Sequence, residues 1–413
     1  MNEQGEMGGA DTGEGAPRSS LLGYGRSFWL LFWATFALNS ASNLFVLYPL
    51  QLVQFGASAG VIGAVIGTWS LASLASRPAA SPLIERLGRR STAMWLLCAD
   101  VLIVALYLPI GAIGWHVYAV RALHGAIEGT ARVALFAMVF GLLPEGREGE
   151  AMSVFSTCGM GSAALAPIVA ELLIRNLGFG AFFLAAIALT AIAAYFARMV
   201  PDDKAPPAAA EVPAAASSAG TLGYGALLLD AGLLPLWIVT LMFALAISCR
   251  LSFVAPFATE RGIVGVAWYF TIYSLVAIAI RLGGARFMDR IGMERALLPS
   301  MIILAAGVAL IAGTGHYRML YIAAALGGLG HAYVYPALSA MVIGRTRADA
   351  IGRSSSIYQS LYDLGAMAGP YSLGAVAMFF GYGPMFVVSG ALALAGGAYF
   401  AAVEPVSRTR RLA

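Results

Sequence analysis

The stretch SRPAASPLIERLGRR at residues 76–90 recurs as IRLGGARFMDRIGMER at residues 280–295. In this alignment the first copy's Arg77, Glu85, Arg86 and Gly88 fall on Arg281, Asp289, Arg290 and Gly292. FALNSASNLFVLYP at 36–49 falls on FALAISCRLSFVAP at 243–256, and Pro167 falls on Pro370 at a shift of 203 residues. Chance does not give so many matches in one order, so the sequence predicts an internal duplication.

The composition indicates that most of the protein surface faces lipid. The 413 residues are 60% hydrophobic and 11% charged, whereas a soluble domain carries about 25% charged residues. A bilayer core needs about 20 apolar residues per helix. Twelve such runs are present, at 27–50, 60–80, 91–112, 117–142, 152–174, 178–199, 233–256, 264–284, 296–314, 317–342, 354–379 and 382–402. We therefore predict an all-α polytopic membrane protein of 12 transmembrane helices in two pseudo-symmetric six-helix bundles.

The charges predict how the chain is oriented and divided. Seventeen of the 25 Lys and Arg fall on one side of the predicted spans, three fall on the other, and five lie inside spans. The positive-inside rule then puts both termini in the cytoplasm. The Pro-, Ala- and Ser-rich stretch near the middle reads as a linker. We expect a disordered N-terminus at 1–26, bundles at 27–199 and 233–402, a cytoplasmic linker at 200–232 and a tail at 403–413.

Several function classes find no support in the sequence. The arginines are scattered among apolar runs and form no basic stripe, which argues against nucleic-acid binding. The three cysteines lack metal-ligand spacing, and we expect no metal and no cofactor. GASAG at 56–60 matches the G-x-S-x-G nucleophile motif but joins two spans, where the required strand is missing. We therefore predict that the protein is not an enzyme.

Four ionisable residues share one face of the fourth predicted span. Arg121, His124, Glu128 and Arg132 lie at relative positions 0, 3, 7 and 11, which puts them on one helical stripe. Charges inside a lipid-embedded helix are costly unless they face a cavity or pair with one another. Two interpretations stay open: a cavity-lining stripe, and a salt-bridge ladder within the helix that only positions it.

Other polar groups inside the spans are further candidates. Arg250 has no acid on its own helix, so it needs a distant acid or an anionic solute. His331 is either a buried core histidine or a cavity group and proton relay. The remaining cavity candidates are Asn39, Asn43, Tyr335 and Asp363.

The sequence resembles the major facilitator superfamily over roughly residues 25–403. SPLIERLGRR at 81–90 is similar to the family's charged loop between spans two and three, with Ser81 and Glu85 replacing Gly and Asp. RALHGAIEG at 121–129 and DLGAMAGP at 363–370 look like its motifs in the fourth and eleventh spans. The resemblance implies packing of span two on span eleven, with an Arg77–Asp363 pair across the halves. An Arg77–Asp100 pair within one half is the alternative.

The resemblance also implies a conformational latch and a transport function. The latch residues would be Arg77, Glu85, Arg86, Gly88, Arg89, Arg90, Arg281, Asp289, Arg290 and Gly292. We expect a monomeric secondary transporter in the bacterial cytoplasmic membrane that moves a small organic solute by alternating access. Proton-coupled export is the favoured direction, with Glu128 and either Asp363 or His331 carrying the coupling. A proton-coupled importer of an organic acid or sugar is the alternative, and a membrane-embedded receptor or enzyme is the disfavoured third class.

Overall fold

The backbone is described by a computed structural model for residues 24–144, 147–201, 223–347 and 350–412; the side chains of 149, 284–291 and 404–412 lie outside that description. Within these ranges the chain forms helices and turns without a strand. The first half contains α1 (Arg26–Leu44), η2 (Phe45–Leu47), α2 (Tyr48–Gln54), α3 (Ala59–Ser76), η3 (Arg77–Ala79), α4 (Ala80–Leu87), α5 (Arg89–Ala105), α6 (Trp115–Phe140) and α7 (Glu148–Met199). The second half contains α8 (Tyr224–Leu228), α9 (Leu234–Glu260), α10 (Ala267–Ile291), α11 (Met293–Ala312), α12 (Tyr317–Arg345), α13 (Ile351–Phe380) and α14 (Tyr382–Leu412).

These elements follow the order of the twelve predicted spans. The first span is α1 continued by η2 and α2, and the second is α3 continued by η3 and α4. The fifth and sixth spans form the single element α7, which Gly178 divides because its φ of 80° and ψ of −179° are not helical. Among the described residues, eight helices are long and apolar enough to cross a membrane by themselves. The all-α, polytopic prediction is confirmed.

Several predicted boundaries differ from the structure. The span predicted at 91–112 ends as a helix at Ala105, because the following turn leads into Pro109 and Gly111. The short helix α8 lies inside the predicted linker, and α14 continues to Leu412, past the predicted end at 402. The predicted disordered segment lies outside the described residues as far as residue 23, and the linker lies outside them at 202–222.

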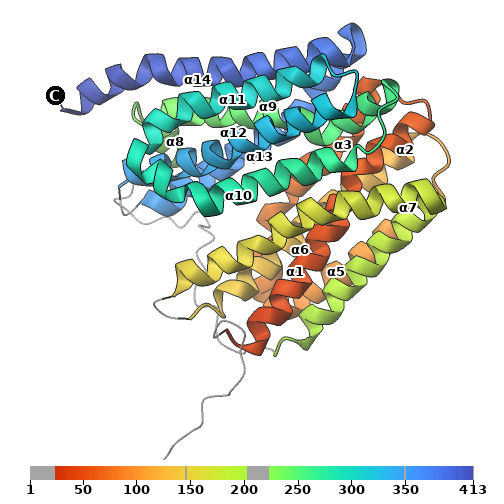
Figure 1. Ribbon diagram of the computed structural model, residues 1–413. Coiled ribbons are helices and arrows are strands. Elements are labelled where there is room, and N and C mark those ends of the chain that lie inside the picture. Colours follow the sequence, from red (N-terminus) through yellow and green to blue (C-terminus); the bar gives the residue numbers. More distant parts are fainter. Residues whose placement is uncertain (1–23, 145–146, 202–222, 348–349, 413) are drawn as a thin grey trace, which may run out of the picture.

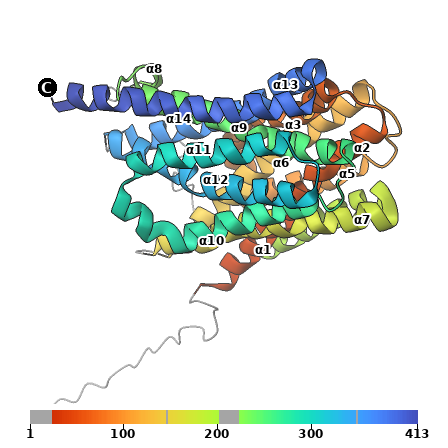
Figure 2. The same ribbon diagram turned by 45° about the horizontal axis from the view of Figure 1, so that its top comes forward.

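The two halves lie side by side, with α14 along the outer edge of the second half (Figure 1 and Figure 2). Across the halves, α3 packs on α13 and α7 packs on α10. We call the end that carries Arg86, Arg90, Arg198 and Arg345 the basic end. The other end, where the chain turns at Gly56, Gly178, Gly262 and Gly381, is the opposite end. The predicted orientation puts the basic end in the cytoplasm.

Glycines let the two halves approach closely near the opposite end. A Cβ on Gly63 would clash with the Pro370 carbonyl, and one on Gly67 would clash with the Tyr371 ring. A Cβ on Gly374 would come within 3.0 Å of the Ala59 carbonyl oxygen. Small residues of this kind permit backbone contact between helices in lipid. The interface between α3 and α13 is therefore tightly packed over the part that leads to the opposite end.

Candidate functional site

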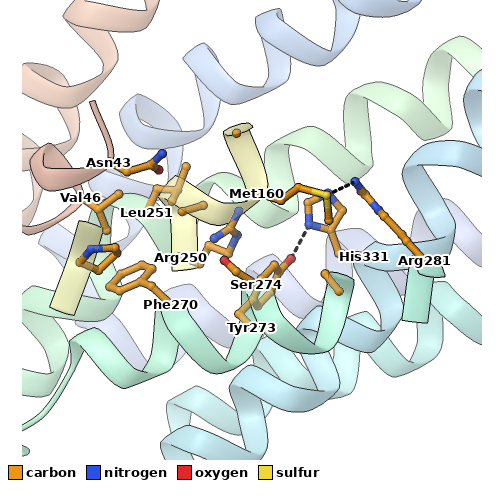
Figure 3. A pocket seen from close by; sticks show the side chains of 14 residues that line it. Asn43, Val46, Met160, Arg250, Leu251, Phe270, Tyr273, Ser274, Arg281 and His331 are labelled. Atoms are coloured by element: carbon orange, nitrogen blue, oxygen red, sulfur yellow. Dashed lines mark hydrogen bonds between the residues drawn. The ribbon is translucent and has the colours of Figure 1, made fainter. Parts of the chain in front are cut away.

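A cavity of about 220 Å³ lies between the two halves (Figure 3). Its volume is small for a ligand pocket, which suits a small solute. The first half lines it with Asn43, Val46, Gly159, Met160, Ala163 and Pro167. The second half lines it with Arg250, Leu251, Phe270, Tyr273, Ser274, Ala277, Arg281 and His331. The cavity therefore occupies the junction of the halves, where duplicated transporters hold their substrates.

Arg250, on α9, reaches the cavity over an aromatic face. Its guanidinium carbon lies 4.2 Å from the centre of the Tyr273 ring on α10, a cation–π distance. The Tyr273 hydroxyl lies 2.7 Å from Nδ1 of His331 on α12. The Tyr273 ring therefore positions the guanidinium by a cation–π contact, and the hydrogen bond to His331 fixes the ring. The buried Nε of Arg250 has no hydrogen-bond partner.

Arg281, also on α10, lines the same cavity, although the sequence assigned it to the latch. Its Nη1 lies 3.9 Å from the sulfur of Met160 on α7, and its buried Nε has no hydrogen-bond partner. Figure 3 shows this arginine reaching across to the methionine from the opposite half. No acid lines the cavity, and in the described part of the chain neither Arg281 nor Arg250 forms a salt bridge.

Glu128, on α6, is the centre of a second polar group, inside the first half. Its Oε1 accepts from Arg132 Nη2 at 2.6 Å and from the Ser42 hydroxyl, and its Oε2 accepts from Trp69 Nε1 at 3.2 Å. Asn39 accepts another hydrogen bond from Arg132. The carboxyl is buried, but the Arg132 side chain is 34% exposed. Hydrogen bonds therefore connect this polar group to α1 and α3, and the Arg132 side chain is its exposed part.

The rest of the predicted stripe on α6 is buried beside this group. His124 Nε2 lies 3.4 Å from Glu128 Oε2 and 3.6 Å from Asp100 Oδ1 on α5. Arg121 lies above three aromatic rings, the nearest being Tyr48 at 5.3 Å from its guanidinium carbon. The pairing within the helix, one of the two interpretations of this stripe, is thus present. None of its four residues lines the 220 Å³ cavity.

Asp363, on α13, lies beside Arg77 rather than in the cavity. The two side chains form an ion pair across the halves, whereas Asp100, the alternative partner, lies near His124. Gln359 donates to the other carboxylate oxygen of Asp363 at 3.2 Å. Tyr335, predicted as a cavity residue, donates instead to Gln359 at 3.0 Å. Tyr335 therefore supports this pair and does not line the cavity.

The predicted latch loop lies at the basic end. Gly88 begins α5 with a φ of 82°, which favours glycine, and Gly292 begins α11 at 85°. Arg90 donates to the carbonyl of Arg198 at the end of α7, at 2.6 Å. Glu85 and Arg86 are exposed and Arg89 is partly buried. The side chains of Asp289 and Arg290 lie outside the described residues. The loop's role as a latch stays a prediction.

Sequence reasoning missed a contact near the opposite end. Glu171, on α7, accepts hydrogen bonds from the backbone of the other half, from Gly265 at 3.0 Å and Ala267 at 2.7 Å. Its carboxylate thereby satisfies free N–H groups at the start of α10 and faces the positive end of that helix. The sequence does carry a signal for Glu171, because an acid inside an apolar run is itself a functional candidate.

Comparison with known proteins identifies the family. The model described as "Major Facilitator Superfamily" matches residues 29–267 and 236–412, which together span nearly the whole chain. The staphylopine export protein of Staphylococcus aureus (strain Mu50 / ATCC 700699) is 23% identical over 371 residues, covering 87% of this chain and 90% of that protein. An uncharacterised MFS-type transporter of Burkholderia mallei (strain SAVP1) is 27% identical over 357 residues, covering 83% of each.

The fold is also that of solved transporter structures. The crystal structure of the nucleoside transporter NupG superposes with a TM-score of 0.77 at 13% identity, covering 92% of this chain and 99% of that one. At this identity the likeness shows the fold alone. The family and the relatives are transporters, which confirms the predictions of a twelve-helix transporter fold and of a protein that is not an enzyme.

Charge reversal tests the pair at the interface between the halves. Asp363→Arg should lower the unfolding free energy by about 1–3 kcal/mol, because it places two guanidinium groups together at a partly buried site. The double variant with Arg77→Asp should recover most of the loss. Thermal unfolding of the purified protein in detergent measures both. A double variant no more stable than Asp363→Arg alone would contradict the pairing.

Neutralising Glu171 tests the contact near the opposite end. Glu171→Gln should weaken the two charge-assisted hydrogen bonds and loosen closure there. A cysteine placed at Ala163 in the cavity, with Cys98, Cys158 and Cys249 replaced, should then react several times faster with a membrane-impermeant thiol reagent added outside the cell. Glu260→Gln removes an exposed acid at the same end and is the control. Equal labelling rates in the two variants would rule out the contact as a gate.

Proposed function

Because the chain belongs to the major facilitator superfamily, we propose that it is a secondary transporter that exports a small anionic organic solute across the cytoplasmic membrane. The observation that carries the proposal is a cavity between the halves whose described lining residues include two arginines and no acid. A guanidinium held away from water needs a negative partner. In Arg250 that partner is missing from the described part of the chain, so the solute supplies it.

The wall of the cavity favours an organic anion over a bare inorganic one. Val46, Leu251 and Phe270 offer apolar surface close to Arg250. A carboxylate can take paired hydrogen bonds from a guanidinium while its hydrocarbon body lies on this surface. An organic cation would meet two arginines there and, among the described lining residues, no acid. The solute class is therefore a small carboxylic acid in its ionised form.

The way the halves meet supports alternating access as the transport mechanism. The glycine contacts and Glu171 hold the halves together towards the opposite end, and the Arg77–Asp363 pair joins them nearer the basic end. In two-bundle transporters, substrate passes when one bundle rocks against the other around a central site. The relation to a staphylopine export protein supports export as the direction.

Glu128 is the proposed site of proton coupling. Its carboxylate pairs with Arg132, whose side chain is partly exposed, so a proton from water can compete with the arginine for it. Protonation would release Arg132 and loosen the bonds that join α6 to Ser42 and Asn39 on α1. A proton would thereby change the packing of α1, the helix that also contributes Asn43 to the cavity.

The solute class is tested in liposomes that contain the purified protein. Labelled glutarate, valerate, glucose and tetraethylammonium are offered in parallel under an imposed pH gradient. The carboxylates should be transported and the sugar and the cation should not, because only an anion satisfies Arg250. Arg250→Gln should lower carboxylate transport at least tenfold. Transport of the cation, or carboxylate transport that Arg250→Gln leaves unchanged, would exclude the proposed function.

The coupling site is tested by Glu128→Gln in the same liposomes. This variant mimics a permanently neutral carboxyl, so it should lose accumulation driven by the pH gradient while keeping exchange of labelled for unlabelled glutarate. Glu150→Gln is the control, since Glu150 is an exposed acid that pairs with Arg147 at the basic end. Full gradient-driven accumulation by Glu128→Gln would exclude Glu128 as the coupling group.

A further inference from the structure

The internal duplication shows that Arg281 lacks the acidic partner that its equivalent, Arg77, has. Arg77 and Arg281 are equivalent in the two copies of the charged stretch. The shift of 203 residues that aligns Pro167 with Pro370 also aligns Met160 with Asp363. The sequence thus contains the same pair of positions twice, once as arginine and aspartate and once as arginine and methionine.

The structure places the two pairs in equivalent surroundings. Arg77, at the end of α3, meets Asp363 on α13 of the other half. Arg281 on α10 meets Met160 on α7 of the other half, with its Nη1 3.9 Å from the sulfur. A thioether is a weak acceptor without charge. Arg77 and Asp363 therefore neutralise each other in an ion pair. At the equivalent positions, Met160 leaves the charge of Arg281 unneutralised.

Arg281 shares its cavity with the other unneutralised arginine. Both Arg281 and Arg250 line the 220 Å³ space, and the Nε of each is buried without a hydrogen-bond partner. In Figure 3 the two side chains extend into view from different parts of the cavity wall, with His331 between them. Two guanidinium groups in one small cavity repel each other unless negative charge is supplied to both. A single carboxylate would leave one of them uncompensated.

We infer that Arg281 is a second anion-binding group and that the transported solute is a dianion, most simply a dicarboxylate. This inference rests on the proposed function, in which Arg250 binds the first carboxylate. Met160 makes the second site possible, because it keeps the position opposite Arg281 free of a competing acid. The apolar residues that line the cavity, which include Met160 and Ala277, receive the hydrocarbon chain that joins the two carboxylates.

Matched acids test the inference on the purified protein in lipid nanodiscs. Succinate, glutarate and adipate are compared by calorimetry with butyrate, valerate and hexanoate, which have the same carbon numbers and one carboxylate each. At least one dicarboxylate should bind ten or more times tighter than its partner. In Arg281→Gln that ratio should fall to within about twofold, which corresponds to a loss of about 1 kcal/mol or more.

Substitutions at Met160 separate charge from packing. Met160→Glu places an acid opposite Arg281, as Asp363 stands opposite Arg77, so it should pair with Arg281 and remove the dicarboxylate preference. Met160→Leu changes the side chain without adding charge and should keep that preference. Arg250→Gln should weaken binding of both acid series, since each uses the first site.

Equal affinity for a dicarboxylate and its matched monocarboxylate, at all three chain lengths, would overturn the second site while the proposed function stands. A preference for dicarboxylates that persists in both Arg281→Gln and Met160→Glu would also overturn the second site. Binding of either series that is unchanged in Arg250→Gln would instead count against the proposed function. The two ideas therefore fail by different results.

Discussion

A guanidinium inside a lipid-embedded bundle must find negative charge, an aromatic face or water, because arginine does not give up its proton. The five arginines inside the predicted spans meet this constraint in different ways. Arg132 and Arg77 bind carboxylates, and Arg121 lies among aromatic rings. Arg250 and Arg281 face the cavity between the halves. The division between neutralised and unneutralised arginines therefore separates the structural framework from the cavity in which we propose that the solute binds.

The duplication explains why this division runs between the halves. Two copies of one six-helix unit start with equivalent positions, so each arginine has a counterpart whose surroundings can be compared directly. In the first half, Glu128 neutralises Arg132. The position equivalent to Glu128 in the second half is His331. The second half contributes both of the cavity's arginines. On the inference drawn above, the change from aspartate to methionine at one position converts a structural pair into a binding group.

Much of the architecture could be predicted from the sequence because lipid imposes simple rules. Apolar runs of about 20 residues, separated by short turns, leave little choice but twelve helices. Gly178 shows a detail that such reasoning leaves out: its non-helical backbone, with a φ of 80°, separates the fifth and sixth spans without a loop. The ends of α5 and α12 also differ from the predicted bounds, since hydropathy marks the lipid and not the hydrogen bonds of the helix.

The site was harder to predict, for a physical reason. A search for charges inside spans finds Arg250, Glu128 and Asp363, but it cannot tell which of them are already neutralised. That depends on distances between helices far apart in sequence, as between Arg77 and Asp363. The repeated charged stretch places Arg281 in the predicted latch, and nothing in the local sequence distinguishes Met160 from the other apolar residues of its span. Met160 becomes informative only when it is compared with Asp363, the acid at the equivalent position of the other copy.

The contacts between the halves are unequal along their length, and this inequality bears on how the cavity opens. Towards the opposite end, backbone meets backbone at Gly63 and Gly374, and Glu171 binds the start of α10. The side-chain ion pair across the halves, between Arg77 and Asp363, joins two partly exposed side chains. Such a pair costs little to separate and to form again, whereas close backbone packing is lost as a unit. The structure is thus closed by packing towards one end and by a reversible charge pair nearer the other. In the transport cycle that we propose, the solute held by Arg250 lies between them, and a small rotation of one bundle exchanges the two kinds of contact.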